Sequence, residues 1–318
     1  MTTFHIPKTQ KAAVLHEPKG EYHIETSWPV TQPNELKPGE CLVKLEWSGV
    51  CHSDLSIKNA EWGNPPKIPL IGGHEGVGTV VAIGEHTIHS AVQVACVTAM
   101  TKFNHGSHMH GTFQEYAVSF ANYVTKIPDS MNGAEAAPIL GLTVYKAIKT
   151  SGARIGQWIA ITGAGGGLGH LAVQYAVAQG LRVIAIEKWV DFGESKNLVA
   201  DVQAATGGPG PQAAIVATGS AESFTQAALY LKSTGTLIGV GVPSGKALLN
   251  LPIALLVSKS LRIIGTMVGD RQDADEAITI APLGKVRTRF ETKPLEDING
   301  VFKAMSEGRI AGRVVLKI

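Results

Sequence analysis

The feature that most constrains the fold is a run of glycines between a predicted strand and a predicted helix. The apolar segment 158–162 precedes GAGGGLG at 163–169, and a helical pattern continues to residue 179. At such a junction free backbone N–H groups and the helix dipole can bind a phosphate, and glycines let the phosphate approach closely. The strict spacing G-x-G-x-x-G is absent, because Leu168 stands at the third glycine position. The flanking strand and helix favour a nucleotide loop over a purely structural turn.

Strands and helices alternate through the second half of the chain, which predicts a parallel sheet covered by helices. The expected strands are 158–162, 182–186, 213–217, 236–240 and 261–266, and the expected helices are 169–179, 221–231 and 273–280. A helix over 295–305 and a strand over 313–317 close the chain.

The first 130 residues have a different pattern, in which short strand-like runs are separated by Pro and Gly. The runs are 11–15, 41–47, 78–83 and 113–118, and an Ala-rich helical pattern follows at 134–150. This half of the chain is therefore expected to be mostly β.

An acidic residue follows the second strand of the predicted parallel sheet. Glu187 lies 18 residues after Gly169. A carboxylate at this place accepts hydrogen bonds from a ribose 2′-OH and repels a 2′-phosphate, which favours NAD over NADP. The alternative is that Glu187 is a solvent-exposed carboxylate in a turn. The positive charge of the adjacent Lys188 weakens the argument for NAD.

Two short motifs in the first half carry residues that bind zinc. GVCHSD at 49–54 contains Cys51, and GGHEGVG at 72–78 contains His74. Thiolate and imidazole are preferred zinc ligands, and a catalytic zinc uses three protein ligands and a water or substrate. Such a zinc polarises an alcohol oxygen beside a nicotinamide. Ser53 could carry away the alcohol proton, and Asp54 could hydrogen-bond a ligating histidine.

Composition excludes several other classes of protein. The net charge of +2 gives no indication of a basic surface that would bind nucleic acid. The sequence has no run of 18 apolar residues, so no membrane span is expected. Three cysteines (Cys41, Cys51 and Cys96) make no disulfide framework, and no targeting signal is evident, so a cytoplasmic location is expected.

The chain resembles the zinc-containing, NAD-dependent alcohol dehydrogenases of the medium-chain dehydrogenase/reductase superfamily, in particular the fungal enzymes. GVCHSD and GGHEGVG match the catalytic zinc motifs, GAGGGLGHLAVQYA the cofactor loop and AGRVVLKI the last strand. The resemblance implies a GroES-like, mostly-β catalytic domain (1–148 and 288–318) and a Rossmann-type, doubly wound NAD-binding domain (149–287). It also implies a cofactor held between the domains and a homo-oligomer, a tetramer in fungi.

The same resemblance assigns roles to individual residues. It makes Cys51 and His74 zinc ligands, with Glu75 a carboxylate beside the metal and Ser53 the start of the proton relay. Trp62 matches a bulky pocket wall that favours small primary alcohols. The residues matched to cofactor contacts are His52 and Arg313 near the pyrophosphate, Gly163, Gly166, Gly167 and Leu168 in the phosphate loop, Glu187 at the ribose, and Val240 and Val268 beside the nicotinamide.

The third cysteine of the family's catalytic zinc is missing. The segment reads APILGLTVYKA at 137–147, where the family has a Cys before the Gly. Glu75 could complete a Cys–His–Glu set, one of the histidines 105, 108 and 110 could supply a ligand, or the site could be weak or empty. Three cysteines cannot form the family's structural Cys₄ site, so one catalytic zinc at most is expected.

The cofactor domain also departs from the family pattern. Only Glu187 and Lys188 separate the strand 182–186 from the apolar run 189–192, and two residues cannot make a parallel crossover. Either one strand is lost or the two segments form one extended run, and the helix that would cover one face of the sheet is expected to be missing. Ser56 also replaces a histidine of the proton relay.

These observations lead to an NAD-dependent, zinc-assisted dehydrogenase that interconverts a small primary alcohol and its aldehyde. Two alternatives stay open at this point. One is a metal-free NAD(P)H-dependent reductase of the same superfamily. The other is a catalytically impaired, truncated form that binds only nucleotide or partner subunits.

Overall fold

The computed structural model describes residues 4–63, 65–87, 94–96, 104–138, 141–186 and 195–318. Contacts divide it into two compact units. The first unit comprises Met1–Leu140, Asp270–Pro282 and Thr288–Ile318, and the second comprises Gly141–Gly269 and Leu283–Arg287. Compared with the expected domain boundaries, residues 141–148 fall in the second unit and 270–282 in the first.

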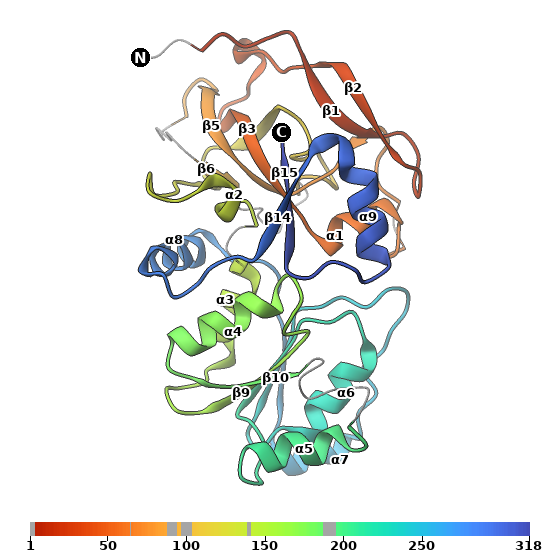
Figure 1. The fold of residues 1–318 in the computed structure, drawn as a ribbon, viewed down its shortest axis with the longest axis vertical. Coiled ribbons are helices and arrows are strands. Elements are labelled where there is room, and N and C mark those ends of the chain that lie inside the picture. Colours follow the sequence, from red (N-terminus) through yellow and green to blue (C-terminus); the bar gives the residue numbers. More distant parts are fainter. Residues whose placement is uncertain (1–3, 64, 88–93, 97–103, 139–140, 187–194) are drawn as a thin grey trace. The chain divides into compact units, whose positions relative to one another are not determined.

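The first unit is mostly β-structure (Figure 1). Its strands are β1 (Thr9–Leu15), β2 (Tyr22–Pro29), β3 (Glu40–Val50), β4 (Leu70–Ile71), β5 (Glu75–Ile83), β6 (Val94–Cys96), β7 (Tyr116–Phe120), β8 (Val124–Thr125), β14 (Phe290–Pro294) and β15 (Arg313–Lys317). Its helices are α1 (His52–Lys58), α2 (Gly133–Ala136), α8 (Arg271–Ile280) and α9 (Ile298–Ser306).

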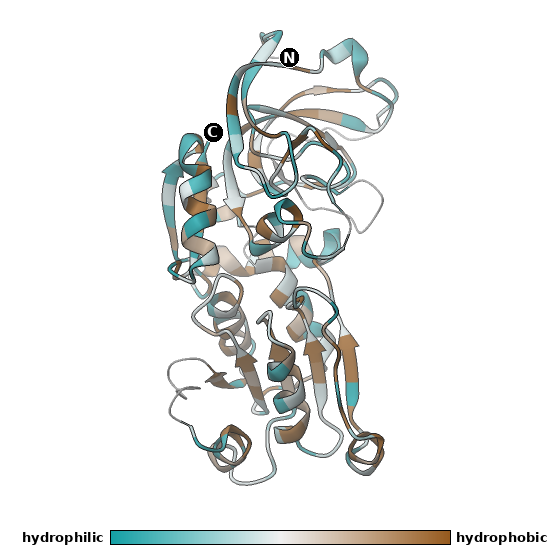
Figure 2. Ribbon diagram, turned by 90° about the vertical axis from the view of Figure 1, so that its right-hand side faces the viewer, coloured by the Kyte–Doolittle hydropathy of each residue, from teal (hydrophilic) through white to brown (hydrophobic). Residues whose placement is uncertain are grey.

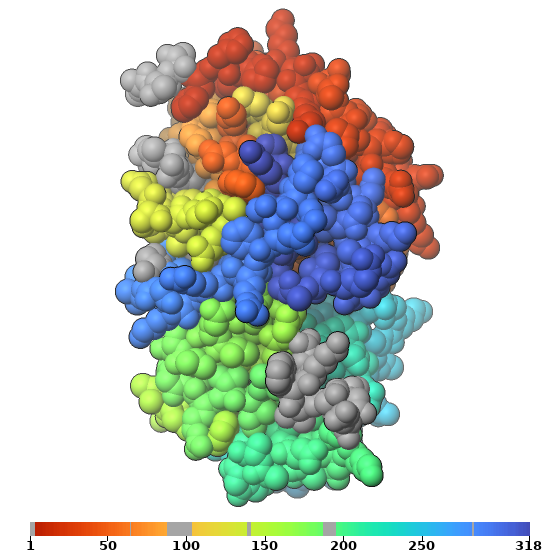
Figure 3. Space-filling view, in the orientation of Figure 1, coloured from red at the N-terminus to blue at the C-terminus, as the bar shows by residue number. Residues whose placement is uncertain are grey.

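Two sheets organise the first unit. One has the order β2-β1-β4, and the other β14-β15-β3-β5-β6-β8, with β7 also paired to β3. β3 is the longest strand, with buried apolar residues along most of its length. The C-terminal β15 pairs with β3, so the end of the chain lies against its first third, as the blue and orange-red surfaces of Figure 3 show. This arrangement brings residues far apart in sequence to adjacent strand ends.

The second unit is a parallel sheet with helices on it. Its strands are β9 (Trp158–Thr162), β10 (Arg182–Ile186), β11 (Ala213–Val216), β12 (Thr236–Gly239) and β13 (Arg262–Gly265), and its helices are α3 (Leu142–Ser151), α4 (Gly169–Ala178), α5 (Leu198–Ala205), α6 (Ala221–Tyr230) and α7 (Ile253–Lys259). The buried strands are largely apolar, as Figure 2 shows, which is typical of a sheet covered on both faces.

The strand order β10-β9-β11-β12-β13 confirms the predicted doubly wound topology. The complete order of this fold is 3-2-1-4-5-6, and β10 occupies the second position. No strand occupies the third position among the described residues. The run 189–192 itself lies outside the described residues.

Several expected elements were wrong or incomplete. The single helix over 134–150 is wrong: α2 and α3 are separate, because Gly141 takes a φ of 68°, outside the right-handed helical region. The strand expected at 113–118 begins only at Tyr116. Eight of the described strands and helices were not predicted, namely β2, β4, β6, β8, β14, α1, α5 and α7. None of the described helices is long and apolar enough to cross a membrane.

Candidate active site

Three neighbouring strands of the first unit bring the predicted metal ligands together. β3 pairs with β5 on one side and β15 on the other, antiparallel in both cases. Because Gly49 lies opposite Glu75 and Val314 opposite Val50, the last residues of β3 face the first residues of its neighbours. Cys51 directly follows β3 and His74 directly precedes β5, so sheet register alone places the two motifs side by side.

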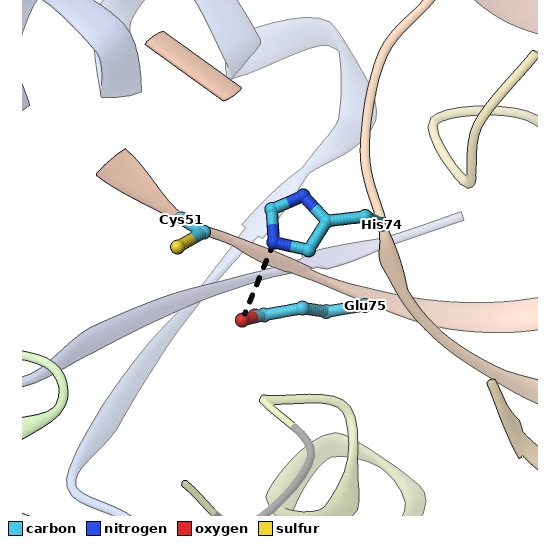
Figure 4. Close-up of side chains that lie close together, drawn as sticks. All are labelled: Cys51, His74 and Glu75. Atoms are coloured by element: carbon cyan, nitrogen blue, oxygen red, sulfur yellow. Dashed lines mark ion pairs between the residues drawn. The ribbon is translucent and has the colours of Figure 1, made fainter. Parts of the chain in front are cut away.

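The side chains of Cys51, His74 and Glu75 reach into one space (Figure 4). One ligand atom from each lies within 4.8 Å of the other two, and among the described residues this is the only such group of three. Glu75 is buried and the other two are partly buried. The histidines at 105, 108 and 110 are therefore not part of it, which favours Glu75 among the third-ligand alternatives.

Asp54 fixes the orientation of His74, as the sequence predicted. Its Oδ1 lies 2.7 Å from His74 Nδ1, and its Oδ2 accepts the backbone N–H of Cys51 at 2.9 Å. Asp54 is almost completely buried. With Nδ1 occupied, Nε2 is the nitrogen left for a metal ion, and it lies 3.9 Å from Glu75 Oε1.

Arg313 forms a contact that the sequence did not predict. Its Nη2 donates to Glu75 Oε2 in a buried ion pair. Glu75 reaches Arg313 across β3 because Gly49 has no side chain, and a Cβ there would overlap the Glu75 carboxylate. The second oxygen, Oε1, stays on the side of His74.

The charges of the group favour a thiolate at Cys51. Burial and the Glu75 carboxylate raise the pKa of the thiol, but the hydrogen bond and charge of His74, with Arg313, lower it below its ordinary value. Burial lowers the pKa of His74, but Asp54 and Cys51 raise it well above its ordinary value. Both shifts favour the charged forms of the two side chains, a thiolate beside an imidazolium.

The donor set fits a zinc ion. A thiolate sulfur, an imidazole nitrogen and a carboxylate oxygen are all zinc ligands, and three protein ligands leave an open position for water or substrate. Cys51, His74 and Glu75 supply one of each, close enough to share a cation. At the position of the family's third cysteine, Ile139 and Leu140 lie outside the described residues and Gly141 is the N-cap residue of α3.

The glycine loop forms between β9 and α4 as predicted. Gly163 has a φ of 70°, a conformation that favours glycine. A Cβ on Gly169 would overlap the carbonyl oxygen of Gly163, so the first residue of α4 also has to be glycine. In the spacing G-x-G-x-x-G the third glycine lets the helix pack closely against the strand. Gly169, one position after Leu168, has this role here. The sequence interpretation missed this, although the glycine was visible in the motif.

The other predicted site residues occupy varied surroundings. His52 and Ser53 are the first residues of α1, the former exposed and the latter half-buried. Trp62 is 41% exposed. Val240 follows β12, and Val268 has a φ of 48°, an unusual value for a β-branched residue and typical of functional sites. Glu187 lies outside the described residues.

Comparisons with known proteins agree with this architecture. Residues 37–129 match the alcohol dehydrogenase GroES-like domain, and residues 167–281 match the zinc-binding dehydrogenase family. The chain is 40% identical to alcohol dehydrogenase 1 of Emericella nidulans, covering 98% of this chain and 99% of that protein. It is 41% identical to the alcohol dehydrogenase of Geobacillus stearothermophilus, covering 97% and 99%.

Solved structures show the same fold. The alcohol dehydrogenase of Aeropyrum pernix superposes with a TM-score of 0.84 at 27% identity, covering 97% of this chain and all of that chain. Acetophenone reductase from Geotrichum candidum, solved in complex with NAD, gives a TM-score of 0.81 at 26% identity over 99% of both chains.

The alignment with the Emericella relative shows that this chain is shorter than that protein. It spans 354 positions, whereas this chain has 318 residues, so at least 36 residues of the relative have no counterpart here. With both domain families matched and near-complete coverage by relatives of about 40% identity, the chain belongs to the zinc-type alcohol dehydrogenases of the medium-chain dehydrogenase/reductase superfamily.

Proposed function

We propose that this chain interconverts a small primary alcohol and its aldehyde, with NAD as the hydride carrier and one zinc ion per chain. The observation that carries this proposal is the meeting of Cys51, His74 and Glu75 at the ends of β3 and β5. Zinc bound there would polarise the alcohol oxygen, and NAD would take up the hydride.

The chain's own residues have distinct tasks in this proposal. Cys51, His74 and Glu75 hold the metal, and Asp54 keeps the His74 ring in place through its 2.7 Å hydrogen bond. Ser53, two residues from Cys51 along the chain, receives the proton of the alcohol. Beyond it the family's relay histidine is replaced by Ser56, whose hydroxyl donates to Glu61 at 2.8 Å. The proton therefore passes to water or to the cofactor ribose.

The cofactor is assigned to the glycine loop of the second unit. The N–H groups of Gly167 and Leu168, just before α4, suit a pyrophosphate, and Gly166, whose own N–H donates to the Gly163 carbonyl at 3.0 Å, lets the phosphate approach closely. Val240 and Val268, just after β12 and β13, are assigned to the nicotinamide. From the first unit, His52 and Arg313 are assigned to the pyrophosphate, and Arg313 Nε has no hydrogen-bond partner within the described structure. Trp62 is proposed to limit the alcohol to a small size.

We expect the enzyme to prefer NAD over NADP by at least about 10²-fold in kcat/KM, because Glu187 would repel the 2′-phosphate. The Glu187→Ala variant should lose at least about tenfold of this discrimination. Steady-state kinetics with both cofactors measures the effect, and Glu85→Ala, a change to a carboxylate outside the cofactor unit, is the control. Equal kcat/KM values for the two cofactors in the unchanged protein would remove the role of Glu187.

The proposal includes a homo-oligomer formed through the second unit. α7 buries none of its residues, although Ile253 and Val257 are 77% and 72% exposed, and Leu248 nearby is 82% exposed. β13 pairs only with β12 in the described sheet, which leaves it an edge strand. An apolar helix beside an open strand edge is suited to self-association about a two-fold axis.

We expect Val257→Glu to dissociate this oligomer, because a charge would be buried at the contact. Analytical ultracentrifugation should show a smaller species for this variant. Ile155→Glu is the matched control, because Ile155 is 83% exposed in the same unit but away from α7 and β13 in sequence. A shift in both variants, or in neither, contradicts the assignment of this surface.

The test of the proposed function combines metal analysis with turnover. About one zinc per chain together with ethanol oxidation supports it. A metal-free protein that reduces carbonyl compounds with NADH or NADPH identifies a reductase, and a protein with neither property is a nucleotide-binding or subunit-binding remnant. A cytoplasmic location stays part of the proposal, since Cys41 and Cys51 form no disulfide.

A further inference from the structure

The first unit contains a second polar cavity that the proposed reaction does not use. Its volume is about 370 Å³, within the range of small-molecule sites. The walls come from β1, β2, β7, residues 67–70, and residues 107–110, which belong to the segment 104–111 that we name the histidine loop. None of the three candidate zinc ligands lines it.

The described residues that line this cavity include basic but no acidic side chains. Its titratable lining residues are Lys67, His108, His110 and Tyr116, and no carboxylate lines it. Lys67 is exposed and forms no ion pair with any described residue, and the His108 ring makes no hydrogen bond among them. A cavity with an unneutralised ammonium and no acidic group favours an anionic ligand.

The two glutamine side chains in the wall are already bonded within the protein. Gln10 Nε2 donates to Gln114 Oε1 at 2.9 Å, and Gln114 Nε2 donates to the carbonyl of Gly111 at 2.7 Å. The backbone N–H of Tyr116 donates to Gln10 Oε1 at 2.6 Å. These amides form a fixed wall, so the charged contacts of a ligand are left to Lys67 and the histidines, beside the hydroxyl groups of Thr31, Ser107 and Tyr116.

His110 presents a hydrogen-bond donor as well. The backbone N–H of Ile71 donates to His110 Nδ1 at 3.3 Å, which leaves the hydrogen of the neutral ring on Nε2. Burial, and then the charge of Lys67, lower the pKa of His110, so the ring is neutral at pH 7. An N–H donor beside an ammonium suits a carboxylate.

The other walls are apolar and partly aromatic. The Trp28 and His110 rings meet edge to face, with centroids 5.4 Å apart. Ile68, Met109 and Val118 complete the apolar lining. This composition suits a small planar, apolar body attached to the charged group.

Main-chain hydrogen bonds between two segments, and not side-chain packing alone, fix the walls of the cavity. The histidine loop and the residues after it bond to the segment before His74: Gly111 N–H donates to the Ile71 carbonyl at 2.7 Å, and Thr112 N–H to the Gly73 carbonyl at 3.1 Å. Binding to a preformed site costs little ordering of the protein.

We propose that this cavity is a binding site for a small aromatic carboxylate, with the carboxylate at Lys67, His108 and His110 and the ring against Trp28. None of the candidate zinc ligands or assigned cofactor-binding residues lines it, and the proposal does not depend on the proposed reaction.

Isothermal titration calorimetry of the full chain with benzoate tests the proposal, with benzamide as the uncharged analogue of equal shape. Benzoate should bind one molecule per chain, and benzamide at least about tenfold more weakly. Lys67→Gln should weaken benzoate binding by at least about tenfold, whereas Lys303→Gln, on the exposed face of α9, should leave it within about twofold.

A carboxylate could also ligate a zinc ion, so the titration is repeated with Cys51→Ala. Unchanged benzoate affinity in that variant supports the cavity as the site. Three results would overturn the proposal: no binding up to about 10 mM benzoate, equal affinity for benzoate and benzamide, or affinity that is lost with Cys51→Ala and kept with Lys67→Gln.

Discussion

The Cys51→Ala variant should lose its zinc and at least about 10³-fold of its kcat/KM for alcohol oxidation. Among the described residues Cys51 supplies the only sulfur of the ligand group, and the two remaining donors, one of them already bound to Arg313, are too few for a tight catalytic zinc. Metal content by plasma emission spectrometry and initial rates with ethanol and NAD measure the two losses on the same sample.

Cys41→Ala provides the matched control. Cys41 lies on β3, the strand that Cys51 directly follows; it is buried and is not part of the ligand group. This variant should keep its zinc and its kcat/KM, with at most a modest loss of stability. Full turnover by Cys51→Ala would show that no metal acts at this site.

Replacing Glu75 should have two separate effects. In the Glu75→Gln variant, zinc affinity should fall by at least about 10²-fold, because the third charged ligand is gone. The free energy of unfolding of the metal-free protein should also fall by about 3–5 kcal/mol, since the buried Arg313 is left without its ion-pair partner. Zinc titration and chemical denaturation measure the two effects independently.

The double variant Glu75→Gln/Arg313→Gln distinguishes the two roles. Removing both charges should restore the stability to within about 1–2 kcal/mol of the unchanged protein, while zinc affinity stays low. Arg313→Gln alone should keep zinc binding, because Glu75 is then free to ligate. Zinc affinity that is equal in all four proteins would exclude Glu75 as a ligand, whatever happens to stability.

Much of the fold could be predicted because its pattern is local. The parallel strands β9 to β13 are short buried apolar runs bounded by turns, and each was found within about two residues. The missed elements lack such patterns: α7 buries none of its residues, and β14 is partly or fully exposed along its length. Without a buried face, neither has a hydrophobic periodicity to detect.

The site could be predicted only for those residues that lie in short sequence motifs. Cys51, His74 and Asp54 lie in two short motifs, and the structure brings them together as expected. The Arg313–Glu75 ion pair joins residues 238 positions apart. It depends on the register of β15 and β5 on either side of β3, which no local pattern specifies. The same register explains why Glu75, rather than a histidine of the histidine loop, completes the ligand group.

X-ray absorption spectroscopy at the zinc edge of the loaded protein tests the central claim most directly. The account predicts about one zinc per chain, with a single sulfur scatterer at about 2.3 Å and the remaining scatterers, nitrogen or oxygen, at about 2.0–2.2 Å. The sulfur signal should vanish in Cys51→Ala. A spectrum with two or more sulfurs, or with none in the unchanged protein, would contradict the Cys51–His74–Glu75 site.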